Sequence, residues 1–225
     1  MNMTVQYFRD SKPGPELEIE KIVTNKIPQL FPHNPEDEFF WTGSSVPIGS
    51  SLPDLLIAVC EPKIFSLSKL KITPTNILSY LRAVGNVKLE TISKRIGESE
   101  KIILKYITDL IDLEIVDTCN NTYFLRPEWR NIISDIISIE VKVSNWRKVI
   151  DQALRNSIYC HRSYVAIPEK ILIKLCNNPH IKAYGVGILS IRKDGNVIVV
   201  KNARKSKPTV WSYYYKIASL IAQKN

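Results

Sequence analysis

The segment from Asp135 to Trp146, DIISIEVKVSNW, constrains the fold of this chain most strongly. Its apolar β-branched residues alternate with polar ones, a period of two that is typical of a β-strand. The two faces would then differ: Ile137, Ile139, Val141 and Val143 on one, and Ser138, Glu140, Lys142 and Ser144 on the other. A strand this rich in β-branched residues belongs inside a protein, yet it carries a carboxylate and an ammonium group on one face.

The segments around this strand alternate between helical and extended patterns, which predicts an α/β fold. Residues 15–31 and 145–160 have the apolar spacing of amphipathic helices, and residues 169–178 are also expected to be helical. Apolar runs predict strands over 36–43, 52–60 and 162–168, and a hairpin turning at Asp194-Gly195. A last helix, with Pro208 at its first turn, closes the chain. We therefore expect a mixed central sheet flanked by helices.

Residues 72–128 have a different rhythm, because three helical segments are followed by a hairpin that turns at Asn120-Asn121. The stretch LETISKRIGESEKIILKYITDLIDLEIV resembles a winged helix-turn-helix domain, with a small helix, a turn at Gly97-Glu98 and a longer second helix. The predicted organisation is a core formed by residues 1–71 and 129–225, with residues 72–128 inserted into it.

Charge is distributed unevenly along the chain. Residues 129–225 contain 17 Lys or Arg and five Asp or Glu, whereas residues 1–71 and 72–128 are slightly acidic. The whole excess behind the net charge of +9 therefore lies in the last part of the chain. Such a polarised surface favours a polyanion as partner, with nucleic acid as the first candidate, although a basic surface that serves only solubility remains an alternative.

Asp54 and Glu140 are the carboxylates most suited to chemistry, because each is expected on a buried strand. Two carboxylates about 4 Å apart repel by about 4 kcal/mol at an effective dielectric constant near 20, so they need a cation or a raised pKa. A Mg²⁺ ion would satisfy this need and leave positions for water and a phosphate. Lys142 lies two residues after Glu140, on the same side of the strand, where it could orient that water.

Pro53-Asp54 followed by Glu140-x-Lys142 on core strands resembles the PD-(D/E)XK nuclease superfamily, which includes restriction endonucleases and Holliday-junction resolvases. The resemblance covers residues 15–60 and 132–168, and it departs from the family in the long insertion between the two motifs. It implies a restriction-endonuclease-like core and a Mg²⁺-dependent DNA endonuclease, in which Mn²⁺ could substitute and dimers are common. The implied site comprises Asp54, Glu140 and the Val141 carbonyl as metal ligands, Lys142 positioning water, and Gln152 with Glu16 or Glu20 in support.

Basic and polar residues are expected to hold the DNA backbone. In the core they lie on the helix after the Glu140 strand and after the last hairpin, and in the insertion at the start of its longest helix. They are Arg147, Lys148, Arg155, Lys201, Arg204, Lys205, Lys207, Ser99, Lys101 and Lys105.

Several alternatives remain open at this stage. Glu140 and Lys142 could be a solvated pair on an edge strand, and the chain could be a DNA-binding regulator or structural subunit without catalytic activity. The aromatic run from Trp211 to Lys216 could stack on bases, but it more often packs against a sheet. The four cysteines form no CxxC pair and the three histidines are scattered, which favours reduced thiols over a zinc site. No apolar run has membrane-spanning length and no signal peptide is recognised, so a cytoplasmic protein is expected.

Overall fold

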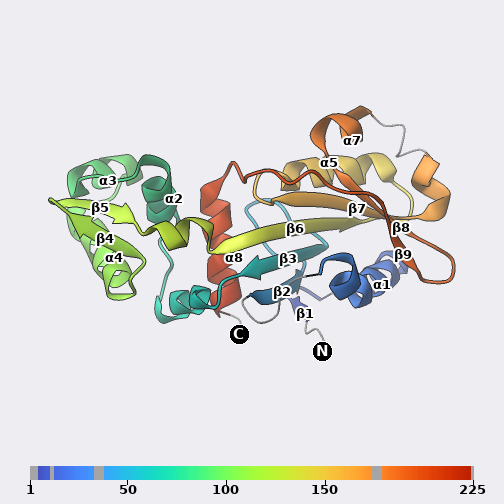
Figure 1. Ribbon diagram of the computed structural model, residues 1–225, viewed down its shortest axis with the longest axis horizontal. Coiled ribbons are helices and arrows are strands. Elements are labelled where there is room, and N and C mark those ends of the chain that lie inside the picture. The colour runs from blue at the N-terminus through green and yellow to red at the C-terminus, as the bar shows by residue number, and fades with distance from the viewer. Residues whose placement is uncertain (1–4, 11–12, 33–37, 174–178, 224–225) are drawn as a thin grey trace. The chain divides into compact units, whose positions relative to one another are not determined.

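The computed structural model describes residues 5–10, 13–32, 38–173 and 179–223. These residues form a seven-stranded sheet in the order β1-β2-β3-β6-β7-β8-β9, with β6 in the middle (Figure 1). The α/β class and the mixed sheet predicted from the sequence are confirmed. In sheet order, the strands span Val5–Tyr7, Phe39–Ser44, Leu55–Cys60, Ile133–Val141, Arg162–Pro168, Gly187–Ile191 and Val197–Lys201.

The sheet mixes both kinds of pairing: the outer pair β1–β2 is parallel, and the outer pair β8–β9 at the other edge is antiparallel. β2 is antiparallel to β3, whereas β6, β7 and β8 are parallel neighbours. Asp54 contacts Val141 and Val59 contacts Ser134, so β3 and β6 run in opposite directions. β8 and β9 form the predicted hairpin, and Gly195 adopts a φ of 80° in its turn.

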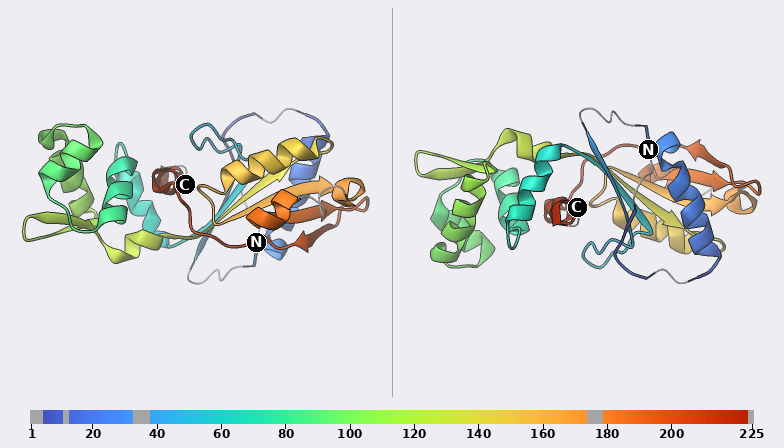
Figure 2. Two further views of the ribbon diagram at one scale, coloured as in Figure 1. Left: turned by 90° about the horizontal axis from the view of Figure 1, so that it is seen from above. Right: turned by 90° about the horizontal axis from the view of Figure 1, so that it is seen from below.

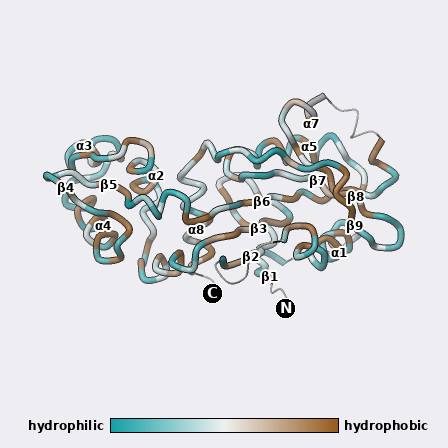
Figure 3. The backbone as a smooth tube through the Cα atoms, in the orientation of Figure 1, coloured by the Kyte–Doolittle hydropathy of each residue, from teal (hydrophilic) through white to brown (hydrophobic). Residues whose placement is uncertain are grey.

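Helices cover both faces of the sheet. α1 (Pro15–Leu30) and α5 (Trp146–Asn156) lie on opposite faces, as the two views of Figure 2 show. α1 packs on the face that carries Ile137 and Ile139, and α5 packs against β7 and β8 on the other face. Hydrophobic segments of the chain accordingly lie within the sheet, and hydrophilic segments lie in the connections around it (Figure 3). Both faces of β6 are buried: Ile137 and Ile139 face α1, whereas the polar residues Ser138 and Glu140 face α5.

The segment between β7 and β8 is only partly described. A short 3₁₀ helix, η3, spans Glu169–Ile171, and α7 spans Pro179–Tyr184. Residues 174–178, half of the helix predicted over residues 169–178, lie outside the described residues, as do His33 and Cys176. Within the described residues, no helix has both the length and the apolar character needed to cross a membrane.

Three helices and a hairpin follow the sheet's third strand. The hairpin predicted at Asn120-Asn121 is present, and both asparagines have the positive φ that a tight turn between strands requires. Its strand β5 also pairs back to Val87 through Tyr123. The elements are α2 (Thr75–Val84), α3 (Leu89–Ile96), α4 (Glu100–Asp112), β4 (Val116–Cys119) and β5 (Thr122–Leu125).

The chain divides into two compact units, and the boundary differs from the one predicted. The sheet unit comprises Met1–Cys60 and Ser134–Thr209, and the helical unit comprises Glu61–Ile133 and Val210–Asn225. The helical unit therefore also holds residues 61–71 and 129–133 and the last helix, which the sequence interpretation had assigned to the core. Three further elements belong to it, namely η1 (Pro62–Lys69), η2 (Pro127–Asn131) and α8 (Trp211–Gln223).

Side-chain contacts explain why α8 belongs to the helical unit. Tyr214 and Tyr215 are buried, so the aromatic run packs inside the protein, but its helix contacts mainly η1 and α2 instead of the expected sheet. The Tyr214 hydroxyl accepts a hydrogen bond from the Ile133 amide at 2.8 Å and donates one to the Ile133 carbonyl at 3.0 Å. α8 begins at Trp211, so Pro208 precedes the helix instead of lying in its first turn. Helical periodicity in a sequence does not reveal which surface a helix will cover.

Candidate active site

Glu140 lies near the end of the central strand β6 and is only 1% exposed. Its neighbour on the same face, Ser138, is fully buried. β6 has β3 on one side and β7 on the other, so it is not an edge strand. The alternative of a solvated pair on an edge strand is therefore wrong for Glu140.

Asp54 immediately precedes β3 and meets β6 at the position of Glu140. Its Oδ2 accepts a hydrogen bond from the Val141 amide at 2.7 Å, although the two residues are 87 positions apart. The carboxyl groups of Asp54 and Glu140 also contact each other. The strand predicted to contain Asp54 begins one residue later, at Leu55, which leaves the side chain at the end of the sheet.

Burial and mutual repulsion perturb both carboxyl groups. Burial, followed by the negative charge of Asp54, raises the pKa of Glu140 from its ordinary value of 4.5 to about 8. Burial also raises the pKa of Asp54, against the lowering effect of the hydrogen bond from Val141. The pair consequently holds a proton near neutral pH, and a cation bound between the two groups could replace that proton.

Lys142 is the first residue after β6, and its amide donates to the Ala166 carbonyl of β7 at 3.1 Å. Its Nζ donates to Glu16 Oε2 at 2.9 Å, which links the strand to the first turn of α1. Burial lowers the pKa of Lys142, but the bond to Glu16 and the charges of Asp54 and Glu140 outweigh burial and raise it. Lys142 is therefore an ammonium group at neutral pH.

Glu20 lies one helical turn after Glu16 on α1. Its Oε1 accepts a hydrogen bond from Ser44 Oγ at 2.6 Å. Burial raises the pKa of Glu20, the Ser44 bond lowers it, and the charge of Asp54 raises it again, so Glu20 interacts electrostatically with Asp54. The structure thus brings both candidate glutamates to the cluster but gives them different neighbours: Glu16 contacts Lys142, and Glu20 lies near Asp54.

Asn156 is a member of the cluster that the sequence analysis missed. It is the last residue of α5, and its Nδ2 donates to Glu140 Oε1 at 2.6 Å. Gln152, which was predicted to support the site, lies one turn earlier and has a buried Oε1 with no hydrogen-bond partner among the described residues. One sequence signal pointed to Asn156: the spacing Val149, Ala153, Asn156 places a polar residue within the helix's buried stripe.

The predicted nucleic-acid contacts in the sheet unit fall into two groups. Arg147, Lys148 and Arg155 on α5 are exposed, as is Lys207. Arg204 and Lys205 are exposed too, but these two and Lys201 bond to the chain itself. Lys201 Nζ donates to the Ile181 carbonyl at 2.6 Å, and Arg204 Nη2 donates to the Ala183 carbonyl at 3.4 Å.

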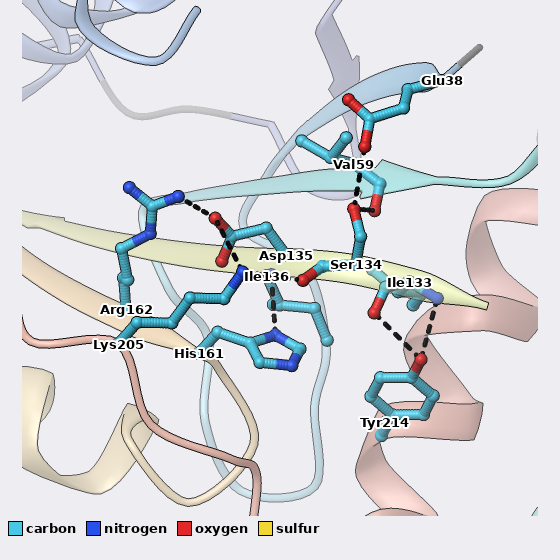
Figure 4. A network of polar contacts seen from close by, with 10 residues as sticks. All are labelled: Glu38, Val59, Ile133, Ser134, Asp135, Ile136, His161, Arg162, Lys205 and Tyr214. Atoms are coloured by element: carbon cyan, nitrogen blue, oxygen red, sulfur yellow. Dashed lines mark hydrogen bonds and ion pairs between the residues drawn. The ribbon is translucent and has the colours of Figure 1, made fainter. Parts of the chain in front are cut away.

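Lys205 belongs to a polar network at the opposite end of β6 from Glu140 (Figure 4). Its Nζ donates to the Ser134 carbonyl at 3.1 Å and lies 3.9 Å from Asp135 Oδ2. Asp135 is buried and also forms an ion pair with Arg162, while His161 Nδ1 accepts a hydrogen bond from the Ile136 amide. Lys205 therefore helps to neutralise the buried carboxylate of Asp135. Its electrostatic attraction for a phosphate is reduced by this interaction.

In the helical unit, Ser99 has a structural role as the N-cap of α4, because its Oγ accepts a hydrogen bond from the Ile102 amide at 3.4 Å. Lys101 and Lys105 are exposed on the same helix. Nothing in these positions conflicts with phosphate binding by the two lysines, and the Ser99 hydroxyl is already engaged.

Within the described residues, no group of three or more His, Cys, Asp or Glu side chains has an arrangement that could hold a metal ion. Asp54 and Glu140 form a pair of carboxylates, which is the number that Mg²⁺ commonly takes from a protein while it keeps several waters. Cys60 and Cys160 are buried free thiols and Cys119 is an exposed one. No protein-family model and no curated protein matches the chain.

Proposed function

We propose that this protein is a metal-dependent DNA endonuclease of the PD-(D/E)XK type. The observation that carries the proposal is the convergence of Asp54, Glu140 and Lys142 at one end of the sheet. Two buried carboxyl groups in contact are unfavourable unless they share a proton or bind a cation, so a cluster of this kind is more typical of a functional site than of a stable core.

The order of the elements supports the same proposal. A helix, an antiparallel succession of β2, β3 and β6, then α5 and a parallel β7 are compatible with a restriction-endonuclease-like core. α2, α3, α4 and the β4–β5 hairpin are compatible with a winged helix-turn-helix subdomain within the helical unit. The long connection after β3, which was the departure from the family pattern, would then be occupied mainly by this subdomain.

The donor set suits a divalent ion. Glu140 Oε2 is buried and has no hydrogen-bond donor among the described residues. Asp54 is fixed beside it by the bond from Val141, so carboxylate oxygens of both residues and the Val141 carbonyl are available as ligands. A Mg²⁺ or Mn²⁺ ion, when bound, would polarise the phosphoryl group and lower the pKa of a water molecule.

The chain's own residues supply the remaining chemistry. Lys142, as an ammonium group, donates hydrogen bonds and can orient the attacking water or offset the negative charge that develops on the phosphate. Glu16 holds the Nζ of Lys142 in place. Glu20 adds negative charge near Asp54, which favours cation binding on that side of the cluster.

In this proposal, the exposed basic side chains of α5 bind the DNA backbone and direct the DNA to the Asp54–Glu140 pair. Arg147, Lys148 and Arg155 lie on the helix whose last residue contacts Glu140. Contacts from such side chains go to phosphates and fix position without sequence preference. A homodimer that cuts both strands is compatible with this proposal, and it would produce linear plasmid as an early product.

Plasmid cleavage tests the proposal directly. Supercoiled plasmid incubated with the protein and Mg²⁺ or Mn²⁺ should be nicked or linearised, and EDTA should prevent this. Asp54→Ala, Glu140→Ala and Lys142→Ala should each abolish cleavage, whereas Asp151→Ala, which removes an exposed carboxylate of α5, should leave it unchanged. Tight DNA binding without nicking under either metal would favour the non-catalytic DNA-binding alternative.

A further inference from the structure

Asn156 occupies an unusual position for a polar residue. It ends α5 and is only 2% exposed, within a buried stripe that otherwise consists of Val149, Ile150 and Ala153. Burying an amide without hydrogen bonds costs about 1–3 kcal/mol in proteins, so the site must satisfy it. Both acceptors that satisfy Asn156 lie on β6.

The two hydrogen bonds of Asn156 fix one side chain of the carboxylate pair. Its Nδ2 donates to Glu140 Oε1 at 2.6 Å and to Ser138 Oγ at 2.9 Å, which uses both hydrogens of the amide nitrogen. Glu140 and Ser138 are two residues apart and therefore face α5 together. With Oε1 held, the Glu140 carboxylate cannot rotate freely, and its buried Oε2 is left without a hydrogen-bond donor among the described residues.

We propose that Asn156 is a positioning residue that holds Glu140 Oε1 so that Oε2 is presented to the metal ion. The inference rests on the proposed function, and it assigns to Asn156 a role that the sequence resemblance gave to Gln152. An amide is suited to this role, because it donates hydrogen bonds at every physiological pH and carries no charge that would compete with or repel a cation. Partners of this kind orient metal ligands in many proteins.

The experiment compares a variant that removes both hydrogen bonds of Asn156 with a variant that removes only the bond to Ser138. Asn156→Leu removes the donor to Glu140 at similar side-chain volume, and Ser138→Ala removes only the other acceptor of Asn156. Calorimetric titration with Mn²⁺, without DNA, measures the dissociation constant for each. We expect Asn156→Leu to bind Mn²⁺ about 10–100-fold more weakly, the usual effect of losing such a partner. Ser138→Ala should stay within about threefold of the parent protein, and saturating Mn²⁺ should restore cleavage by Asn156→Leu.

The outcomes separate the inference from the proposed function. If the parent protein binds no Mn²⁺, both are overturned. If the parent binds Mn²⁺ and Asn156→Leu binds it equally well, only the role of Asn156 is overturned. Equal weakening in both variants would overturn it too, because it would indicate a general effect on packing.

A structure of the parent protein with Mn²⁺ decides the matter if Asn156→Leu does not fold, as judged by near-ultraviolet circular dichroism. Anomalous scattering should then place the ion on Glu140 Oε2, with the bond from Asn156 to Oε1 retained. An ion bound through Oε1, with Asn156 displaced, would overturn the inference.

Discussion

At the scale of single residues, burial beside Asp54 raises the pKa of Glu140. The folded protein keeps a proton on Glu140 up to about pH 8, whereas the unfolded chain releases it near 4.5. Between these values the folded state binds more protons than the unfolded state, so the free energy of unfolding falls as pH rises. The metal-free protein is therefore expected to be most stable, as far as this group is concerned, below about pH 4.5.

Replacing Glu140 by Gln should remove this pH dependence. In EDTA, we expect Glu140→Gln to gain stability over the parent protein progressively between pH 5 and pH 8, measured by urea unfolding at several pH values. Asp151→Asn, an exposed carboxylate on α5, serves as the control and should follow the parent. Parallel curves for Glu140→Gln and the parent would mean that Glu140 does not hold a proton in the folded state.

The sequence left Glu16 and Glu20 as alternatives for the same role. Their contacts now distinguish them. Glu16 touches Lys142, and Glu20 lies near Asp54. Glu20→Gln should therefore weaken Mn²⁺ binding in calorimetry, with a dissociation constant several-fold higher. Glu16→Gln should instead lower kcat by about tenfold, within the usual range for lost supporting contacts, with little change in Mn²⁺ affinity. The reverse pattern would make Glu16 the residue closer to the ion.

At the scale of elements, α8 depends on hydrogen bonds made by one tyrosine. Tyr214→Phe leaves the amide and carbonyl of Ile133 without their partner in a buried place. This should reduce the free energy of unfolding by about 1–3 kcal/mol, as measured by urea unfolding. Tyr106→Phe, on α4 of the same unit and only partly buried, should change it by less than about 0.5 kcal/mol. Equal effects would show that the Ile133 contacts do not stabilise this helix.

The helices, strands and turns also show how much of the fold could be predicted from the sequence. Local rules were sufficient for the two hairpins, since Asn120-Asn121 and Asp194-Gly195 are turn residues for physical reasons. The period of two correctly placed Glu140 on one face of its strand. What could not be predicted depends on contacts between distant segments, namely the packing of α8 and the bond from Asn156 to Glu140. The spacing Val149, Ala153, Asn156 indicated a buried position for Asn156, but it could not show that the side chain bonds to Glu140.

At the scale of the whole molecule, the residues that carry the excess positive charge differ in whether they bond to the chain itself. Lys201, Arg204 and Lys205 bond to carbonyl groups of the chain, although Arg204 and Lys205 are exposed, as are the basic residues of α5. Contact of DNA with the basic residues after the last hairpin stays a prediction, and in it these internal bonds would compete with phosphate contacts. Electrostatic affinity depends on how many phosphates are neutralised, and side chains already engaged within the protein neutralise fewer.

Salt dependence of DNA binding measures this distribution. Each lost phosphate contact should reduce the slope of log K against log salt by about 0.9 for duplex DNA. Replacing Arg147, Lys148 and Arg155 together by Ala should therefore flatten the slope by about three, measured by fluorescence anisotropy between low and moderate salt. Replacing Lys101 and Lys105 of α4 in the same way should change the slope by about two if the helical unit also contacts DNA. If the α5 variant keeps the slope of the parent protein and the α4 variant does not, the DNA binds to the helical unit. Binding of DNA along α5 to the Asp54–Glu140 pair would then be wrong.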